Sequence, residues 1–445
     1  MSGSKISSFG SQIFILVTTM IIAFFILAGV TSAGLPMEEW NRTFGGPDNN
    51  DEAYFVQETS DGGYILAGNT GSYGAGEKDA WLIKTDSEGF EVWNRTFGGN
   101  GSDTVGSVHE TANGGFILAG FTSPKGSEWS DAWLIKTDSE GFEEWNRTYE
   151  GGEGSMAYSV QETKDGGYIV LSSSTSTELL EGGILSRFDA WLIKTDSEGF
   201  EEWNRTFGGR GIDIFVSFQE TADGGYILAG YTEEDYETLI FDAWLIKTDS
   251  NGVEEWNRTF GGGGIDTFGS VHETADGGYI LGGFTSPKGS ESSDAWLVKT
   301  DSKGVEEWNR TLGDQDVVET VCSARETKDG GYIVLSSSIS SESLEGNIIP
   351  RFSASLTKTD SKGFEEWNRT FEGLDIFIAH TLQETSDGGY VFTASRLEGR
   401  FMEGQTDAVL VKVGDERSTP GFEIFTGLAS GALIAVILVL RRERE

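Results

Sequence analysis

The sequence predicts an all-β protein built from seven copies of one unit, and three observations lead to this prediction. The string Trp-Asn-Arg-Thr occurs seven times at intervals of 52 to 59 residues. Each copy is followed by an (Asp/Asn)-Gly-Gly turn and then by Asp-Ala-Trp-Leu-Ile-Lys-Thr-Asp or a degenerate form of it. Between the two hydrophobic ends, no stretch shows the 3.6-residue period of a helix. The seven strings begin at Trp40, Trp93, Trp145, Trp203, Trp256, Trp308 and Trp367.

Each unit is expected to contain four short antiparallel strands. In the second unit these are residues 107–111, 116–121, 132–137 and 144–149, with a tight Asn113-Gly114 turn after the first. Four strands in a repeat of this length are typical of a β-propeller blade, whereas the rungs of a β-helix are much shorter. We therefore expect a seven-bladed β-propeller over residues 37–414.

The phase of the repeat predicts how the ring closes. The repeat region begins with a fourth strand at residues 38–44 and ends after a third strand at 407–413. The N-terminal strand is thus expected to complete the last blade, which removes exposed sheet edges. In its repeats the chain resembles the propellers common in archaeal and bacterial surface proteins.

A second period points to one face of the propeller. Units two and five share Phe-Thr-Ser-Pro-Lys-Gly-Ser-Glu, and units three and six share a longer string, so a three-blade block was duplicated. The copies differ most between the second and third strands: units three and six have 16-residue loops at 173–188 and 337–352, against 10 residues in units two and five. These loops should emerge on one face and are candidates for binding. Trp129, outside the repeated strings, is the candidate binding aromatic on that face.

The two ends predict export and anchoring. Residues 1–33 contain an apolar run followed by Thr-Ser-Ala and are interpreted as a signal peptide, with an uncleaved anchor as the alternative. Residues 424–440 are long enough for a transmembrane helix, and the basic residues in 441–445 predict a cytoplasmic tail. The region between them is then extracellular.

A sorting motif stands in the linker at residues 415–423. Pro420, Gly421 and Phe422 precede the hydrophobic segment and the basic end, and together these resemble the PGF-CTERM signal of archaeal surface proteins. The resemblance implies that an archaeosortase removes the tail and attaches the new end to a lipid. Either kind of anchor places the protein on the outer face of the cell membrane.

The net charge and the cysteine content limit the classes of partner, disulfide and metal site that the sequence can support. With 32 Lys and Arg against 72 Asp and Glu, the net charge is −40, which disfavours nucleic acid as a partner. The single cysteine, Cys322, excludes an intramolecular disulfide and a Cys-based zinc site, and we expect an inert buried thiol. The expected partners are the membrane, through the anchor, and a surface protein or glycan. No cofactor is predicted, although the acidity suits divalent cations.

Residues repeated in every blade are expected to be scaffold, because a catalytic site needs unlike groups. A glutamate ends each first strand and should accept hydrogen bonds from the neighbouring blade, with a cation-binding ring as the alternative. The sets typified by Lys84 and Arg95 should pair with carboxylates. His109, His272 and His380 lack the spacing of zinc ligands. The glutamates are Glu58, Glu110, Glu162, Glu220, Glu273, Glu326 and Glu384.

Two motifs imitate known sites. The loops at 98–103, 208–213 and 261–266 resemble the Gly-Gly-x-Gly-x-Asp repeat of calcium-binding β-rolls, but they are not in tandem. The turn at 86–89 resembles the Asp-box of sialidases, with its aspartate one residue too far from the glycine. Neither motif is expected to bind a metal or form an active site.

Asn-x-Ser/Thr sequons are candidate glycosylation sites because an outer blade strand is exposed. They are Asn41, Asn94, Asn100, Asn146, Asn204, Asn257, Asn309 and Asn368.

The expected function is non-enzymatic: a binding, adhesion or envelope-structural protein of the cell surface. The alternative is an extracellular enzyme acting on glycans, sialidase-like or lyase-like, since propellers also host enzymes. One blade with unique, convergent polar residues would favour the enzyme, and the sequence shows no such blade.

Overall fold

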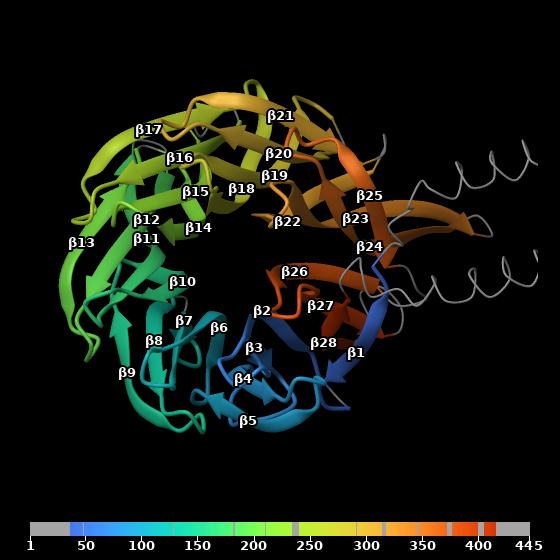
Figure 1. Ribbon diagram of the computed structural model, residues 1–445. Coiled ribbons are helices and arrows are strands. Elements are labelled where there is room, and N and C mark those ends of the chain that lie inside the picture. The colour runs from blue at the N-terminus through green and yellow to red at the C-terminus, as the bar shows by residue number, and fades with distance from the viewer. Residues whose placement is uncertain are drawn as a thin grey trace, which may run out of the picture. The chain divides into compact units, whose positions relative to one another are not determined.

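Seven four-stranded antiparallel sheets surround a central opening in the computed structural model, which describes residues 36–414 except 48, 128, 181–182, 210, 234–239, 291, 314–316, 345–346, 372–375 and 399–404 (Figure 1). The predicted all-β, seven-bladed propeller is confirmed. Within the described part of the chain, no helix is long and apolar enough to cross a membrane. The signal peptide at 1–33, the linker and sorting motif at 415–423, the transmembrane helix at 424–440 and the tail at 441–445 lie outside the described residues.

Blades one to four use consecutive strands, numbered from the innermost outward. Blade 1 comprises β2 (Asp51–Glu58), β3 (Tyr64–Thr70), β4 (Asp79–Thr85) and β5 (Glu91–Phe97). Blade 2 comprises β6 (Ser102–Glu110), β7 (Phe116–Ser123), β8 (Asp131–Thr137) and β9 (Glu143–Tyr149). Blade 3 comprises β10 (Gly154–Glu162), β11 (Tyr168–Leu180), β12 (Gly183–Thr195) and β13 (Glu201–Phe207). Blade 4 comprises β14 (Asp213–Glu220), β15 (Tyr226–Thr232), β16 (Asp242–Thr248) and β17 (Glu254–Phe260).

The remaining blades follow the same order until the ring closes. Blade 5 comprises β18 (Gly264–Glu273), β19 (Tyr279–Pro287), β20 (Asp294–Thr300) and β21 (Glu306–Leu312). Blade 6 comprises β22 (Val318–Glu326), β23 (Tyr332–Leu344), β24 (Asn347–Thr359) and β25 (Glu365–Phe371). Blade 7 comprises β26 (Ile376–Glu384), β27 (Tyr390–Glu398), β28 (Gln405–Val413) and, from the start of the repeat region, β1 (Glu38–Phe44).

The N-terminal strand closes the ring as predicted. β1 pairs antiparallel with β28, with Asn41 opposite Val411 and Phe44 opposite Ala408. Every sheet therefore has its fourth strand.

The interiors between blades hold the apolar core. Second and third strands of one blade pack on those of the next, as Ile65 and Leu82 of blade 1 do in a cluster with Leu118 and Trp133 of blade 2. These strands are buried on both sheet faces, which explains their runs of consecutive apolar residues, such as Tyr-Ile-Leu-Ala in β3 and Ala-Trp-Leu-Ile in β4.

The outer strands interlock through the repeated tryptophan. Trp203 of blade 3 lies against the turn of blade 4, where a Cβ on Gly252 would come within 2.6 Å of the indole. Gly252 also has φ +71°, so both space and backbone conformation favour glycine there.

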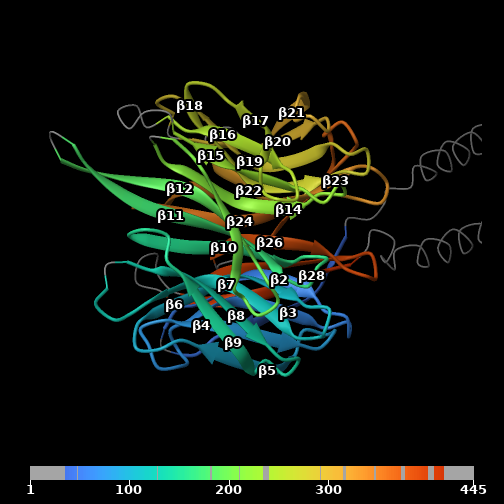
Figure 2. The ribbon, with the colours of Figure 1, turned by 90° about the vertical axis from the view of Figure 1, so that its left-hand side faces the viewer.

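The prediction of 16-residue loops in blades 3 and 6 is wrong. Residues 173–188 and 337–352 largely form strands, because β11, β12, β23 and β24 are each 13 residues long, against seven for β3 and β4. They are extended β-hairpins, registered from Tyr168↔Thr195 to Leu180↔Gly183 in blade 3. The sequence signal was Thr, Ile or Leu before a central Glu-Gly and Ile or Leu after it. Figure 2 shows the β11–β12 hairpin projecting well beyond the body of the ring.

Candidate binding face

The two ends of the sheets form two different faces. Tight turns between first and second strands and between third and fourth strands, such as 59–63 and 86–90, lie on what we term the turn face. Connections between second and third strands and between successive blades, such as 71–78 and 98–101, lie on the opposite, connection face. The two extended hairpins belong to the connection face.

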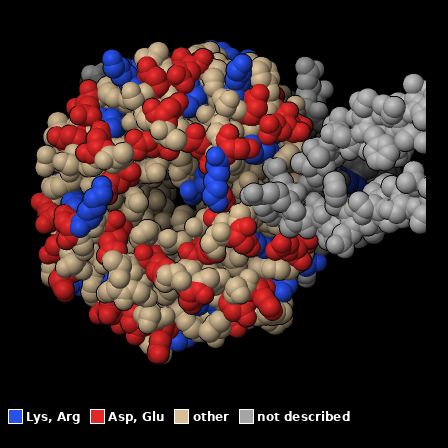
Figure 3. Space-filling view, viewed as in Figure 1, with Lys and Arg blue, Asp and Glu red and all other residues tan. Residues whose placement is uncertain are grey.

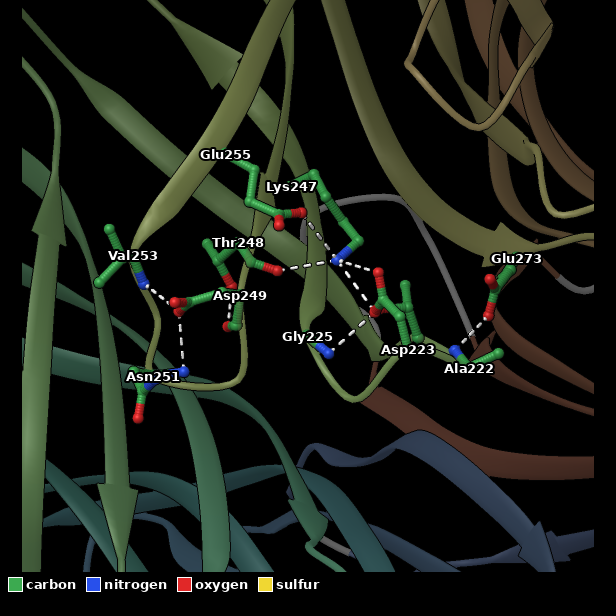
Figure 4. A network of polar contacts seen from close by, with 11 residues as sticks. Ala222, Asp223, Gly225, Lys247, Thr248, Asp249, Asn251, Val253, Glu255 and Glu273 are labelled. Atoms are coloured by element: carbon green, nitrogen blue, oxygen red, sulfur yellow. Dashed lines mark hydrogen bonds and ion pairs between the residues drawn. The ribbon is translucent and has the colours of Figure 1, made fainter.

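On the turn face, the repeated glutamates join neighbouring blades. The backbone N–H of Ala222 in blade 4 donates to Glu273 of blade 5 at 2.8 Å (Figure 4). The N–H of Ser386 donates to Glu58 at 2.7 Å and so links blade 7 to blade 1. The predicted scaffold role of these glutamates is confirmed in these contacts.

The repeated lysines pair with carboxylates, as predicted, and they are also buried. Lys247 is 3 % exposed, and its Nζ lies 3.0 Å from Asp223, 3.4 Å from Glu255 and 2.8 Å from the carbonyl of Thr248 (Figure 4). Burial acts to raise the pKa of Asp223, but hydrogen bonds from Thr221, Gly225 and Lys247 outweigh it and lower the pKa to about 2. Comparable ion pairs are made by Lys84, Lys136, Lys194, Lys299, Lys358 and Lys412.

The arginine set acts on repeated carboxylates through its charge, as predicted, but its shortest contacts are with other groups. The hydrogen bond from the N–H of Val253 and, more weakly, the charge of Arg205 lower the pKa of Asp249. The guanidinium of Arg95 lies 5.2 Å from the ring of Trp93 and 4.4 Å from that of Phe142 in the next blade, and it donates to the carbonyl of Asn94. These contacts are with rings and a carbonyl instead of carboxylates. Four members of the set contact a phenylalanine of the next blade in this way and so join outer strands by cation–π contact: Arg42, Arg95, Arg147 and Arg310.

In both motifs that resemble known sites, the aspartate accepts hydrogen bonds from backbone N–H groups and stabilises its own loop. Asp103, in the loop at 98–103, accepts hydrogen bonds from the N–H of Gly99 and the hydroxyl of Thr122. Asp86 accepts from the N–H groups of Glu88 and Phe90, both at 2.9 Å. Within the described residues, no group of three or more His, Cys, Asp or Glu side chains is placed to hold a metal ion.

The connection face departs from the sevenfold repeat. Besides the two hairpins, it carries Trp129, whose side chain is 46 % exposed and lies beside Gly154 of blade 3. The expected position of Trp129 on this face agrees with the structure. The space-filling view in Figure 3 looks onto the opposite, turn face, which is rich in acidic side chains and hollowed at its centre.

The innermost strands bring unlike residues together where blades 7 and 1 meet. The Tyr54 hydroxyl donates to Glu52 at 2.5 Å, and the Tyr54 ring lies edge-on to His380, with centroids 5.3 Å apart. The Nε2 of His380 lies 2.8 Å from the hydroxyl of Ser395. Burial lowers the pKa of His380 to about 4, against a smaller opposing effect of Glu52, and burial also raises the pKa of Tyr54.

This cluster corrects the sequence analysis, which found no unique convergent polar residues. Aligning the seven first strands on their final glutamate places Tyr54 and His380 at one position, where the residues differ widely. A comparison position by position could therefore have found the cluster. The residues at that position are Tyr54, Gly106, Tyr158, Val216, Gly269, Cys322 and His380.

The other titratable candidates serve packing. Burial lowers the pKa of His109 and of His272. Both occupy the first-strand position that Gln57 holds in blade 1. There the Gln57 side chain accepts a hydrogen bond from the N–H of Glu110. Cys322 is half-buried instead of fully buried, 3.5 Å from the hydroxyl of Ser337, and burial raises its pKa.

The sequon asparagines lie on the outer strands, except Asn100, which lies in an exposed loop. Asn94 is half-buried, and the others on outer strands are exposed. Most of these side chains donate to a glutamate three residues earlier, as Asn41 does to Glu38 at 2.6 Å. Their position is compatible with attached glycans.

No protein-family model and no curated protein sequence matches the chain. Among solved structures, it is similar to the WD40 domain of Pan2 from Neurospora crassa, at 8 % identity and TM-score 0.51, covering 84 % of this chain and 94 % of that domain. It is also similar to an ulvan lyase of a polysaccharide lyase family bound to a saccharide, at 9 % identity and TM-score 0.53, covering 84 % and 96 %. At these identities, the likeness shows the propeller fold alone.

Proposed function

We propose that this protein is a non-enzymatic binding protein of the outer cell surface, and that its connection face receives a surface protein or an envelope glycan. The main support for this proposal is that the blades differ from one another on the connection face and are alike on the turn face. The turn face repeats the same lysine, glutamate and aspartate contacts around the ring, while the connection face carries two extended hairpins and the exposed Trp129. Rigid scaffolds that present variable segments commonly use them for binding.

An exchange of hairpins tests this function. Residues 173–188 and 337–352 are each replaced by the ten-residue connection of blade 2, residues 121–130. The exchanged protein should keep a β-sheet circular dichroism spectrum and cooperative thermal unfolding, and it should lose binding to isolated envelope from the native host. Exchanging the connection of blade 5, residues 284–293, for that of blade 2 is the matched control and should preserve binding. Full binding after the hairpin exchange would contradict the proposed face.

The surface location rests on the two ends of the chain. The signal peptide at 1–33 and the motif Pro420-Gly421-Phe422 before residues 424–440 support export, followed by attachment to the membrane through a lipid, as in archaeal proteins with PGF-CTERM signals. Mass spectrometry of the native membrane fraction should find no peptides from residues 424–445. Intact C-terminal peptides would leave a simple transmembrane anchor.

One observation favours an enzyme as the second candidate. Glu52, Tyr54 and His380 form a group of unlike titratable side chains, as acid–base catalysis requires. A lyase-like or sialidase-like activity on glycans would depend on these residues. Assays on envelope polysaccharides, with His380→Gln as control, distinguish the two candidates: turnover lost in this variant would support the enzyme.

A further inference from the structure

A groove opens between blades 3 and 4 at the rim of the connection face. It has a volume of about 620 Å³, which is within the range of small-molecule sites. One wall is the end of β13 with the following Gly208 and Gly209, and the other is formed by β16 and β17. The β11–β12 hairpin, which the proposed function uses, belongs to blade 3, one of the two blades that form the groove.

An aromatic ring lines this groove and is held rigidly. Trp244 stacks on the fully buried Phe215, with ring centroids 4.7 Å apart and an angle of 24° between the planes. Trp244 is only partly buried, whereas its four counterparts in other blades are 2 to 7 % exposed. Those counterparts are Trp81, Trp133, Trp191 and Trp296. Blade 4 thus differs from them in leaving part of this indole open.

The polar groups around the ring favour a ligand rich in hydroxyl groups. Glu254, Asn257 and Thr259 are exposed on β17, and Thr206 faces them from the end of β13. A carboxylate accepts hydrogen bonds, while amide and hydroxyl groups both donate and accept them. The carboxyl groups of the buried Asp213 and Glu233 line the groove together with that of Glu254 and give it negative charge. An anionic ligand would be repelled.

We infer that this groove binds a neutral sugar, one apolar face of which lies against Trp244 while its hydroxyls bond to the pair formed by Glu254 and Asn257. Within this pair the Asn257 amide donates to one oxygen of Glu254, so the pair presents a fixed set of polar groups to the ligand. The inference rests on the proposed binding function and narrows its ligand to a saccharide. A ring with one apolar face and peripheral hydroxyls matches an aromatic surface edged by carboxylate and amide.

The repeats supply the control for a test. Asn309 and Glu306 hold the same positions in blade 5, where Trp296 is buried. The protein, produced in a host that does not glycosylate asparagine, is titrated by calorimetry and saturation-transfer NMR with glucose, galactose, mannose and N-acetylglucosamine. Glucuronic acid serves as the charged probe. At least one neutral sugar should bind, and glucuronic acid should bind much more weakly.

The variants then locate the site. Asn257→Ala should weaken binding of that sugar about tenfold, as expected for one lost hydrogen bond in the groove, and Asn309→Ala should leave it unchanged. Glu254→Gln against Glu306→Gln repeats the comparison without altering a sequon. The inference is overturned if no neutral sugar binds, or if the blade 4 and blade 5 variants behave alike. Envelope binding that still depends on the hairpins would then leave the proposed function standing.

Discussion

At the level of single residues, the repeated polar side chains hold blades together, and the buried lysine is the clearest case. Replacing Lys247 by methionine removes the partner of Asp223 and leaves the carbonyl of Thr248 without this donor. We expect Lys247→Met to lower the free energy of unfolding by about 2 kcal/mol. Lys164→Met, which removes an exposed lysine paired with Glu220, should leave it nearly unchanged. Urea unfolding of the two variants checks this; equal effects would contradict it.

His380 predicts a dependence on pH. Because burial lowers its pKa from 6.5 to about 4, the unfolded chain takes up a proton there before the folded protein does. The resulting stabilisation is present above pH 6.5 and is lost as the pH falls toward 4, by at most about 3 kcal/mol. His380→Gln should lack this component, so the stability difference between the variant and the wild type should change across that range. A constant difference from pH 7 to pH 4, measured by urea unfolding, would show that His380 does not titrate as inferred.

Single residues also show which roles could be predicted from the sequence alone and which could not. The roles of Glu273 and Lys247 followed from repetition alone, because a residue found in every blade must suit a contact that every blade makes. A comparison of the seven first strands can single out Tyr54 and His380. Their approach to each other, like the contact of Arg95 with Phe142, could not be predicted because it depends on which side chains of adjacent blades meet. The open indole of Trp244 depends on packing between blades 3 and 4 in the same way.

At the level of elements, the presence and the order of the strands were predictable from the repeat length, the turn residues and the amino-acid composition. The extended hairpins were missed although their sequences carry a strand signal, because these residues vary between blades and such variation is typical of loops. Their length follows from pairing: each 13-residue strand continues its register to the hairpin end.

The prediction at the level of elements concerns the strand β1, which closes the ring. Deleting residues 34–46 removes β1 and exposes the edge of β28, with the loss of the apolar contacts of Phe44. We expect a marked fall in melting temperature or solubility, whereas deletion of residues 34–36 alone should have little effect. A synthetic peptide of residues 34–46 should restore stability to the truncated protein. An unchanged melting temperature after the longer deletion would refute closure by this strand.

At the level of the whole molecule, charge sets the response to salt. Without residues 1–33 and 420–445, the chain keeps 28 basic and 69 acidic residues, a net charge of −41. Self-repulsion of this size disfavours the compact state and is screened by salt. The melting temperature of residues 34–419 should therefore rise with sodium chloride and with magnesium or calcium chloride. A melting temperature that stays flat from low to molar salt would contradict this expectation.

The central claim is that the propeller binds through its connection face. Hydrogen–deuterium exchange of residues 34–419, with and without isolated native envelope, maps this contact directly. We expect the envelope to slow exchange in β11–β12, in β23–β24 and around Trp129, while the turns at 59–63 and 86–90 remain unchanged. Protection confined to the turn face, or no protection anywhere on the ring, would contradict the account.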